Sequence, residues 1–173
     1  MPEFIPVTRK DEIQRQLTVM ADAISNDYRG RELILIGVLK GAFVFLADLI
    51  RQIKLETIKI DFLQASSYGA DTVSSENIVL KKDIDIDIRG KDVLLVEDIV
   101  DTGLTLSRII EHLKGHGPRS IKVCTMIDKK ERRMIDICVD YACMSVDKGF
   151  LVGYGLDYAE NYRNLPELYH LKL

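Results

Sequence analysis

The sequence has few of the residues that bind transition metals or form disulfides. It contains 3 cysteines and 3 histidines among 173 residues, with neither a Cys-x-x-Cys nor a His-Glu-x-x-His motif. An odd number of cysteines in apolar stretches is typical of reduced, buried thiols inside a cell. These counts argue against a zinc site. They predict that any metal is bound by carboxylates, which favour a hard ion such as Mg²⁺.

Long apolar runs and an excess of positive charge are also lacking. The apolar runs 33–39 and 42–47 are far shorter than the roughly 20 residues that span a bilayer. Glu3, Asp11 and Glu12 interrupt the N-terminus, where a signal peptide would be apolar. Lys and Arg total 24 against 27 Asp and Glu, for a formal net charge of -3, which argues against non-specific nucleic-acid binding. We therefore expect a cytoplasmic protein that binds neither membrane nor nucleic acid.

The spacing of hydrophobic residues predicts an α/β fold in a single domain, residues 1–173, without repeats or linkers. Wholly apolar runs at 33–38 and 93–96 predict strands that are covered on both faces. Helical spacing predicts helices over 11–26, from 41 to 50, and through 106–113. Further strands are predicted at 57–65, 78–88, 121–127 and 137–146, and a last apolar piece at 150–152 precedes a polar tail. This alternation indicates a mainly parallel, twisted sheet flanked by helices, with its ligand at the carboxyl ends of the strands.

Three aspartates alternate with isoleucines in the predicted strand 78–88. Asp83, Asp85 and Asp87 would all lie on one face of that strand. Like charges on one face repel each other unless an ion or solvent separates them. We interpret these aspartates as a solvated face rather than as a metal site.

The segment 93–106, VLLVEDIVDTGLTL, carries the clearest chemical signal. Glu97 and Asp98 end an apolar strand and need partners, such as sugar hydroxyls or a divalent ion. Small and hydroxyl residues then lead into a helix, whose first N–H groups form a cradle for an anion. These anion-binding residues are Asp101, Thr102, Gly103, Leu104 and Thr105. Together they predict a site for a ribose 5-phosphate. If Asp101 or Thr102 were only a helix cap, the two carboxylates would remain unexplained.

This segment resembles the phosphoribosyl pyrophosphate signature of the type I phosphoribosyltransferases, and it lacks the pattern of a Walker A loop. Other segments are similar to the hypoxanthine-guanine phosphoribosyltransferase family: GVLKGAFVF, SSYG, MIDKK, FLVGYGLDY and YRNLP, in matching order over nearly the whole chain. The resemblance implies that family's sheet with a small hood formed by the N- and C-terminal segments. It also implies a flexible active-site loop at 66–77 that includes Ser67 and Tyr68. The resemblance implies too that the peptide bond between Leu39 and Lys40 can be cis.

The resemblance also implies roles for single residues. Lys40, Gly41 and Arg163 would bind pyrophosphate. Lys129 would donate to the 6-oxo group of a purine. The remaining residues of the base subsite would be Phe150, which stacks on the base, Leu151, whose backbone reads its exocyclic position, and Asp157. Two Mg²⁺ ions are implied, one beside Glu97 and Asp98 and a second held by Asp157. Asp101 is the candidate to accept the purine N7 proton.

Taken alone, several of these residues have ordinary interpretations. Phe150 would be a core residue, Lys129 part of the solvated run DKKERR, and Arg163 a surface residue. As a set, they imply a purine-salvage enzyme that transfers phosphoribose from phosphoribosyl pyrophosphate to hypoxanthine and guanine, as a homodimer or homotetramer. Two alternatives remain: another base such as xanthine or uracil, and a regulator of the same fold that senses phosphoribosyl pyrophosphate and binds nucleic acid.

Overall fold

The computed structural model describes residues 2–66 and 79–172. The helices are α1 (Lys10–Asp27), α2 (Phe43–Ile50) and α3 (Leu104–Gly115). The strands are β1 (Glu3–Thr8), β2 (Leu33–Leu39), β3 (Ile58–Ser66), β4 (Val79–Lys82), β5 (Asp92–Val100), β6 (Ser120–Lys129), β7 (Tyr141–Val146), β8 (Leu151–Val152) and β9 (Leu168–Lys172). Among these residues, no helix is long and apolar enough to cross a membrane.

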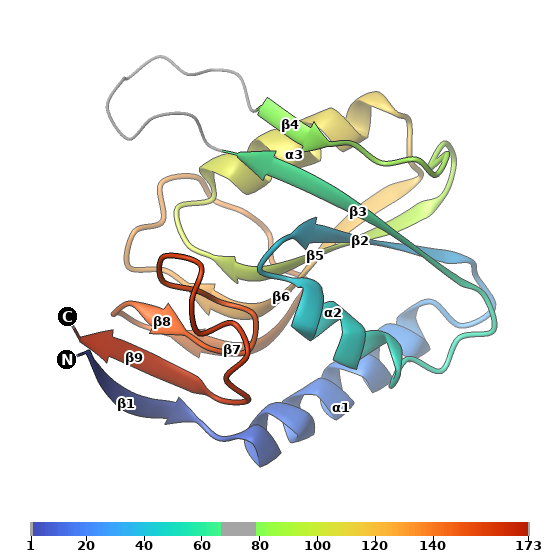
Figure 1. The fold of residues 1–173 in the computed structure, drawn as a ribbon. Coiled ribbons are helices and arrows are strands. Elements are labelled where there is room, and N and C mark those ends of the chain that lie inside the picture. The colour runs from blue at the N-terminus through green and yellow to red at the C-terminus, as the bar shows by residue number, and fades with distance from the viewer. Residues whose placement is uncertain (1, 67–78, 173) are drawn as a thin grey trace.

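The larger sheet has six strands in the order β4-β3-β2-β5-β6-β7 (Figure 1). All neighbouring strands are parallel except β4, which runs antiparallel to β3 at one edge. The mainly parallel α/β architecture predicted from the hydrophobic pattern is therefore confirmed.

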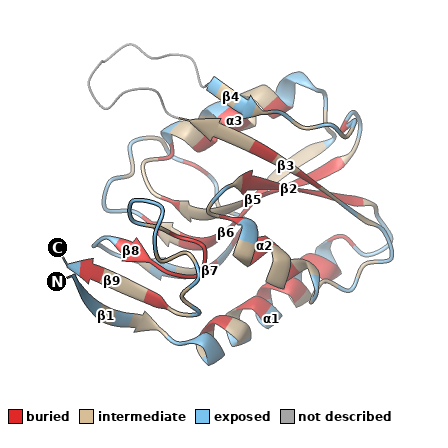
Figure 2. Cartoon of the chain, in the orientation of Figure 1, coloured by how far each residue is buried: buried red, intermediate tan, exposed pale blue. Residues whose placement is uncertain are grey.

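Helices cover both faces of this sheet because its central strands are apolar on both sides. Leu33 and Leu35 of β2 pack with helices α1 and α2, whereas Ile34 and Ile36 pack with α3. This division follows from the alternation of side chains along a strand. Figure 2 shows the buried residues concentrated in the central strands and on the inner sides of the helices.

The chain ends form a second, three-stranded antiparallel sheet in the order β1-β9-β8. Figure 1 shows its strands beside β7, with both termini at the same end of the small sheet. The expected hood of N- and C-terminal segments is thus present. The tail predicted to be polar contains β9, and Leu168 and Leu171 of this strand are buried.

Three predicted strand boundaries are wrong. The predicted strand 78–88 ends at Lys82, because Asp61 accepts the backbone N–H groups of Asp85 and Ile86 at 2.6 and 3.0 Å and removes them from strand pairing. The strand predicted from 137 begins at Tyr141. The strand predicted to end at 96 continues to Val100, since β6 goes on pairing with it after β2 has diverged.

Asp92, at the start of β5, is a buried carboxylate that binds the start of β6. Its side chain is 1% exposed and accepts hydrogen bonds from Ser120 Oγ at 2.6 Å and from Arg119 at 3.1 and 2.9 Å. Burial alone would raise its pKa, but the Ser120 hydroxyl and the Arg119 guanidinium outweigh burial and hold the pKa below its ordinary value. The carboxylate form therefore stabilises the fold.

Replacing Asp92 with asparagine is expected to lower the free energy of unfolding by about 2 kcal/mol at pH 7, the range for hydrogen bonds to a charged group. Because the folded-state pKa is lowered, this contribution is present above the ordinary pKa of 3.8. It is lost as the pH falls through the folded-state value. Urea unfolding at pH 7 and in acid would measure both effects, and the difference between wild type and variant should shrink in acid. Asp87→Asn, which changes an exposed carboxylate, is the control, and equal unfolding midpoints for Asp92→Asn and wild type would contradict the prediction.

Candidate active site

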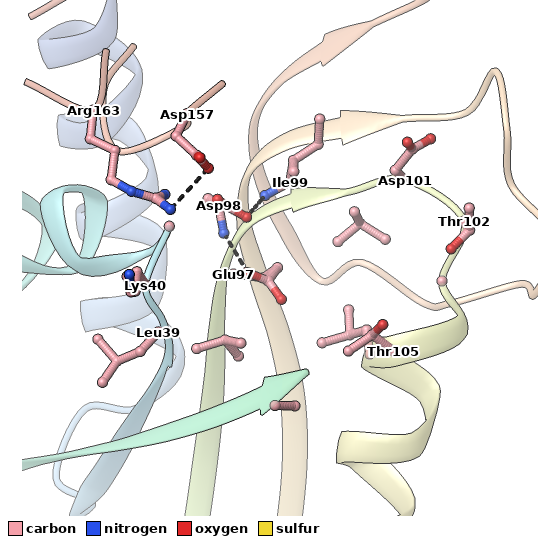
Figure 3. A pocket seen from close by; sticks show the side chains of 16 residues that line it. Leu39, Lys40, Glu97, Asp98, Ile99, Asp101, Thr102, Thr105, Asp157 and Arg163 are labelled. Atoms are coloured by element: carbon pink, nitrogen blue, oxygen red, sulfur yellow. Dashed lines mark hydrogen bonds and ion pairs between the residues drawn. The ribbon is translucent and has the colours of Figure 1, made fainter. Parts of the chain in front are cut away.

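A cleft of about 360 Å³ lies at the carboxyl ends of β2 and β5 (Figure 3). Most of the predicted site residues line it: Lys40, Gly41, Glu97, Asp98, Asp101, Thr102, Gly103, Thr105, Asp157 and Arg163. In Figure 3, Lys40, Asp157 and Arg163 lie on one side of the Glu97–Asp98 pair, and Thr102 and Thr105 lie on the other. The cleft therefore has a cationic side and an anion-binding turn, separated by two carboxylates.

Glu97 and Asp98 lie inside β5 but beyond its pairing with β2, which ends at Val96. Glu97 Oε1 accepts the Asp98 N–H at 3.0 Å, and Asp98 Oδ1 accepts the Ile99 N–H at 2.6 Å. Burial raises the pKa of both carboxyls, and the negative charge of Asp98 raises that of Glu97 further. Neither forms an ion pair with a cation in the part of the chain that is described. A pair of oxygen ligands in need of positive charge fits a magnesium ion.

The chain between β2 and α2 passes very close to the carboxylate pair. The Leu39–Lys40 peptide is cis, as the resemblance implied. A Cβ atom built on Gly41 would lie 1.6 Å from Asp98 Oδ2, and one built on Gly155 would lie 2.3 Å from the Gly41 carbonyl oxygen. Glycine is therefore required at position 41 for its backbone to fit between Asp98 and the turn at Gly155.

The turn before α3 has the geometry of an anion cradle. Gly103 adopts φ +82°, and a Cβ there would meet the Ile135 carbonyl oxygen at 2.7 Å. The Thr102 carbonyl accepts the N–H groups of Met134 and Ile135 at 2.9 and 3.1 Å, which fixes the turn. The first N–H groups of α3 have no acceptor within the helix, and its dipole favours negative charge there. Leu104 is exposed and does not line the cleft, and its N–H donates to Thr102 Oγ1 at 3.3 Å.

Asp101 presents an unpaired oxygen between this turn and the end of β6. Its Oδ1 is buried and accepts no hydrogen bond from the described residues. Its Oδ2 lies 3.9 Å from Lys129 Nζ and 3.9 Å from an Arg132 Nη atom. A buried carboxylate oxygen without a donor is suited to accept a proton from a bound molecule.

Three of the residues predicted to recognise a base, Lys129, Phe150 and Leu151, do not line the cleft, whereas the fourth, Asp157, does. Lys129, the last residue of β6, is 6% exposed, so its interpretation as part of a solvated run is wrong. Its Nζ lies 3.4 Å from Glu131, whose carboxylate accepts the Gly149 N–H at 3.3 Å. Phe150 is 52% exposed, so it is not a core residue, and its ring meets the Tyr158 ring edge to face. Leu151 is buried in β8.

The cationic side of the cleft is built from the segment after β8. Arg163 is 19% exposed, which excludes an ordinary surface position. It donates to the Gly155 carbonyl at 2.8 Å and pairs with Asp157 Oδ1 at 2.9 Å, while its buried Nε has no partner within the described chain. Asp157 Oδ2 accepts the Glu160 N–H at 2.8 Å. Both oxygens of Asp157 are thus engaged, and a cation there would share them with these donors.

Two residues of the site were missed by the sequence reasoning. Glu160 pairs with Lys40 Nζ at 2.9 Å and with Arg163 at 3.5 Å, so its single negative charge is shared between both predicted pyrophosphate cations. Arg133 donates to the carbonyls of Asp101 and Lys129 at 2.8 and 3.1 Å and holds the two segments together. No local motif marks either residue.

The predicted loop residues Ser67 and Tyr68 lie outside the described residues, and only Ser66 of the 66–77 loop is described, at the end of β3.

Comparison with known proteins agrees with this geometry. Residues 7–159 match a family model described as a phosphoribosyl transferase domain. The chain is 46% identical over 162 residues to the hypoxanthine-guanine phosphoribosyltransferase of Aquifex aeolicus, covering 93% of this chain and 90% of that protein.

Solved structures of related enzymes have the same fold. A hypoxanthine-guanine phosphoribosyltransferase from Bacillus anthracis, with a HEPES molecule in its active site, superposes with a TM-score of 0.93 at 42% identity, covering 100% of both chains. The Trypanosoma cruzi hypoxanthine phosphoribosyltransferase, in complex with its product IMP, has a TM-score of 0.90 at 36% identity and covers 98% of this chain and 94% of that one. Given its signature segment, its cleft and these relatives, the chain belongs to the hypoxanthine and hypoxanthine-guanine phosphoribosyltransferases of the type I phosphoribosyltransferase family.

Proposed function

We propose that this protein is a purine-salvage enzyme that transfers the 5-phosphoribosyl group from phosphoribosyl pyrophosphate to hypoxanthine and to guanine. The products are IMP or GMP, and pyrophosphate. One observation supports this function above the others: a single cleft holds an anion-binding turn, a carboxylate pair and a cationic side, in the order that a phosphorylated ribose with a pyrophosphate at carbon 1 requires.

The charges of the cleft orient the substrate in one direction. The 5-phosphate would bind the N–H groups and hydroxyls of the turn 101–105, and the ribose hydroxyls would face Glu97 and Asp98. The pyrophosphate would lie near Lys40, Gly41 and Arg163, and it would compete with Glu160 for the two cations. This orientation directs carbon 1 toward the side of the cleft where Asp101 meets Lys129.

The base would lie beyond Asp101. The buried ammonium of Lys129 would donate to the 6-oxo group, Phe150 would stack on the ring, and the Leu151 backbone would face the exocyclic position. Glu131 restrains Lys129 and at the same time binds the N–H of the residue before Phe150. The three groups that contact the base would therefore keep their relative positions.

We propose that Mg²⁺ is the cofactor. Glu97 and Asp98 would hold one ion, and Asp157 a second. When bound, Mg²⁺ supplies positive charge that stabilises the departing pyrophosphate. In its absence Arg163 and Lys40 are the protein cations on that side of the cleft.

The reaction breaks the bond between carbon 1 and the pyrophosphate oxygen, which keeps the electron pair. A purine ring nitrogen forms the new bond to carbon 1, and the N7 proton passes to Asp101. The transition state has oxocarbenium character, so the chain contributes mainly by holding both partners in line and by neutralising charge. The loop 66–77, with Ser67 and Tyr68, is proposed to exclude water from this cation.

An assay with phosphoribosyl pyrophosphate, Mg²⁺ and one base at a time tests the function. Hypoxanthine and guanine should each yield nucleotide, EDTA should abolish the reaction, and adenine and uracil should be inactive. Turnover with xanthine or uracil in place of hypoxanthine would contradict the proposed base. Tight binding of phosphoribosyl pyrophosphate without turnover of any base would favour the regulator that binds nucleic acid.

Lys129→Ala should reduce the preference for 6-oxo over 6-amino purines by at least about tenfold, because the lost donor pairs with an oxygen that only the former carry. The ratio of kcat/KM for hypoxanthine to that for adenine measures this preference. Lys130→Ala is the matched control, since that neighbouring lysine is exposed and pairs with Asp128 instead. An unchanged ratio in Lys129→Ala would contradict the proposed role.

We further propose that the single domain 1–173 assembles as a homodimer or homotetramer in the cytoplasm. Sedimentation equilibrium would measure the assembly, and a monomer at micromolar concentration would contradict this proposal.

A further inference from the structure

A cluster of metal-ligating side chains lies outside the active site, where the C-terminal half of α3 meets the chain that follows β4. It consists of Asp83, His112 and His116, whose ligating atoms all lie within 4.8 Å of one another. His112 is eight residues beyond Leu104, the first residue of α3, which corresponds to about 12 Å of helix. The cluster is therefore separate from the anion-binding turn at the other end of this helix.

The three side chains lie close together at the surface, where Asp83 and His116 are exposed and His112 is half-buried. His112 Nε2 lies 2.9 Å from each carboxylate oxygen of Asp83. The His112 and His116 rings meet edge to face, with their centroids 5.0 Å apart. His112 lies in the last turn of α3 and His116 is the C-cap residue of that helix, and their spacing of four residues places both side chains on the same face.

A simple ion pair between Asp83 and His112 accounts for only part of this arrangement. It leaves His116, whose ring nitrogen lies within ligand reach of both other groups. Two imidazoles and one carboxylate are the ligands of many zinc sites, and the fourth position is then filled by water. Magnesium would select the all-oxygen pair at Glu97 and Asp98 instead.

We propose that Asp83, His112 and His116 bind a divalent transition-metal ion of the zinc class. The ion would tie the end of α3 to the segment after β4 and would stabilise the folded state. It would take no part in phosphoribosyl transfer. The histidine and cysteine counts alone argued against such a site, because a carboxylate far away in the sequence completes it.

The test uses the full chain, stripped with EDTA, dialysed, and kept in millimolar Mg²⁺ to occupy the carboxylate pair. Calorimetric titration with Zn²⁺ should give one site per chain. Zinc at 100 times its Kd should raise the Tm by about 5–10 °C, by mass action on the folded state. Titration with Co²⁺ should give the visible absorption of a nitrogen- and oxygen-ligated ion.

Variants assign the ligands. His112→Ala and His116→Ala should each weaken Zn²⁺ binding by at least about tenfold and, at the same Zn²⁺ concentration, should reduce the Tm shift to about half or less. Glu111→Ala is the matched control, since this neighbouring carboxylate on α3 pairs with Arg108 and should leave binding unchanged. Far-UV circular dichroism of the metal-free variants checks folding, and His116→Gln repeats the test with a side chain of similar size.

The proposal is overturned if the histidine variants bind Zn²⁺ as tightly as wild type, or if wild type binds no stoichiometric Zn²⁺ below millimolar concentration. It is also overturned if the double variant Glu97→Gln, Asp98→Asn loses Zn²⁺ binding, because the ion would then sit at the carboxylate pair. Retention of binding in that double variant supports the separate site. None of these readouts depends on transferase activity, so they remain informative if the proposed function fails.

Discussion

Replacing Asp101 with asparagine is expected to lower kcat by about 10²–10⁴-fold, the contribution of a general base in a well-ordered site. Its Oδ1 is buried and unpaired, and its Oδ2 lies 3.9 Å from Lys129 Nζ. Asparagine keeps the size of the side chain but cannot take up the N7 proton. Steady-state kinetics with hypoxanthine would measure the loss. Direct titration should find that phosphoribosyl pyrophosphate still binds, since the backbone of the turn is unchanged.

The matched control is Asp136→Asn, which replaces an exposed carboxylate in the segment that follows Arg133. It should turn over at the wild-type rate. If Asp101→Asn kept wild-type kcat, Asp101 would be removed from the proton transfer. If that variant lost substrate binding along with turnover, its role would be to hold the turn, and the proton would need another acceptor.

Gly41→Ala should lower kcat/KM for phosphoribosyl pyrophosphate by about 10²-fold, the cost of a displacement near 1 Å at reacting groups. The added Cβ would lie 1.6 Å from Asp98 Oδ2 and 2.6 Å from its Cγ. Either the carboxylate or the backbone after Lys40 must move. Movement of Asp98 breaks its 2.6 Å hydrogen bond with the Ile99 N–H, and movement of the backbone displaces a proposed pyrophosphate ligand.

Gly115→Ala provides the control for this change. A Cβ at Gly115, the last residue of α3, meets nothing within 4 Å, so this variant should keep wild-type kinetics and stability. Thermal unfolding would separate the two possible causes of a loss in Gly41→Ala. If Gly41→Ala loses activity while its Tm is unchanged, the loss comes from local displacement at the site. If it keeps wild-type kcat/KM, the chain between β2 and α2 tolerates the added methyl group.

The sequence determined those features that follow from local patterns. The apolar runs of β2 and β5 indicated strands covered on both faces, as in a parallel sheet that lies between two layers of helices. The carboxylates that follow Val96 and the small residues that begin α3 were visible as a site because charge next to an apolar strand needs partners. The resemblance then implied roles for residues such as Lys129 and Arg163, which have no distinctive local pattern.

Only the tertiary structure decided which distant groups meet. Arg133 joins Asp101 to Lys129, Glu160 pairs with both Lys40 and Arg163, and none of these pairings has a sequence signal. Asp61 ends β4 early by binding backbone N–H groups 24 and 25 residues away, so the alternating pattern beyond Lys82 misled the strand prediction. The burial, partners and protonation of a charged side chain depend on atoms contributed by other segments. Hydrophobic periodicity describes one segment at a time, so it does not predict these three properties.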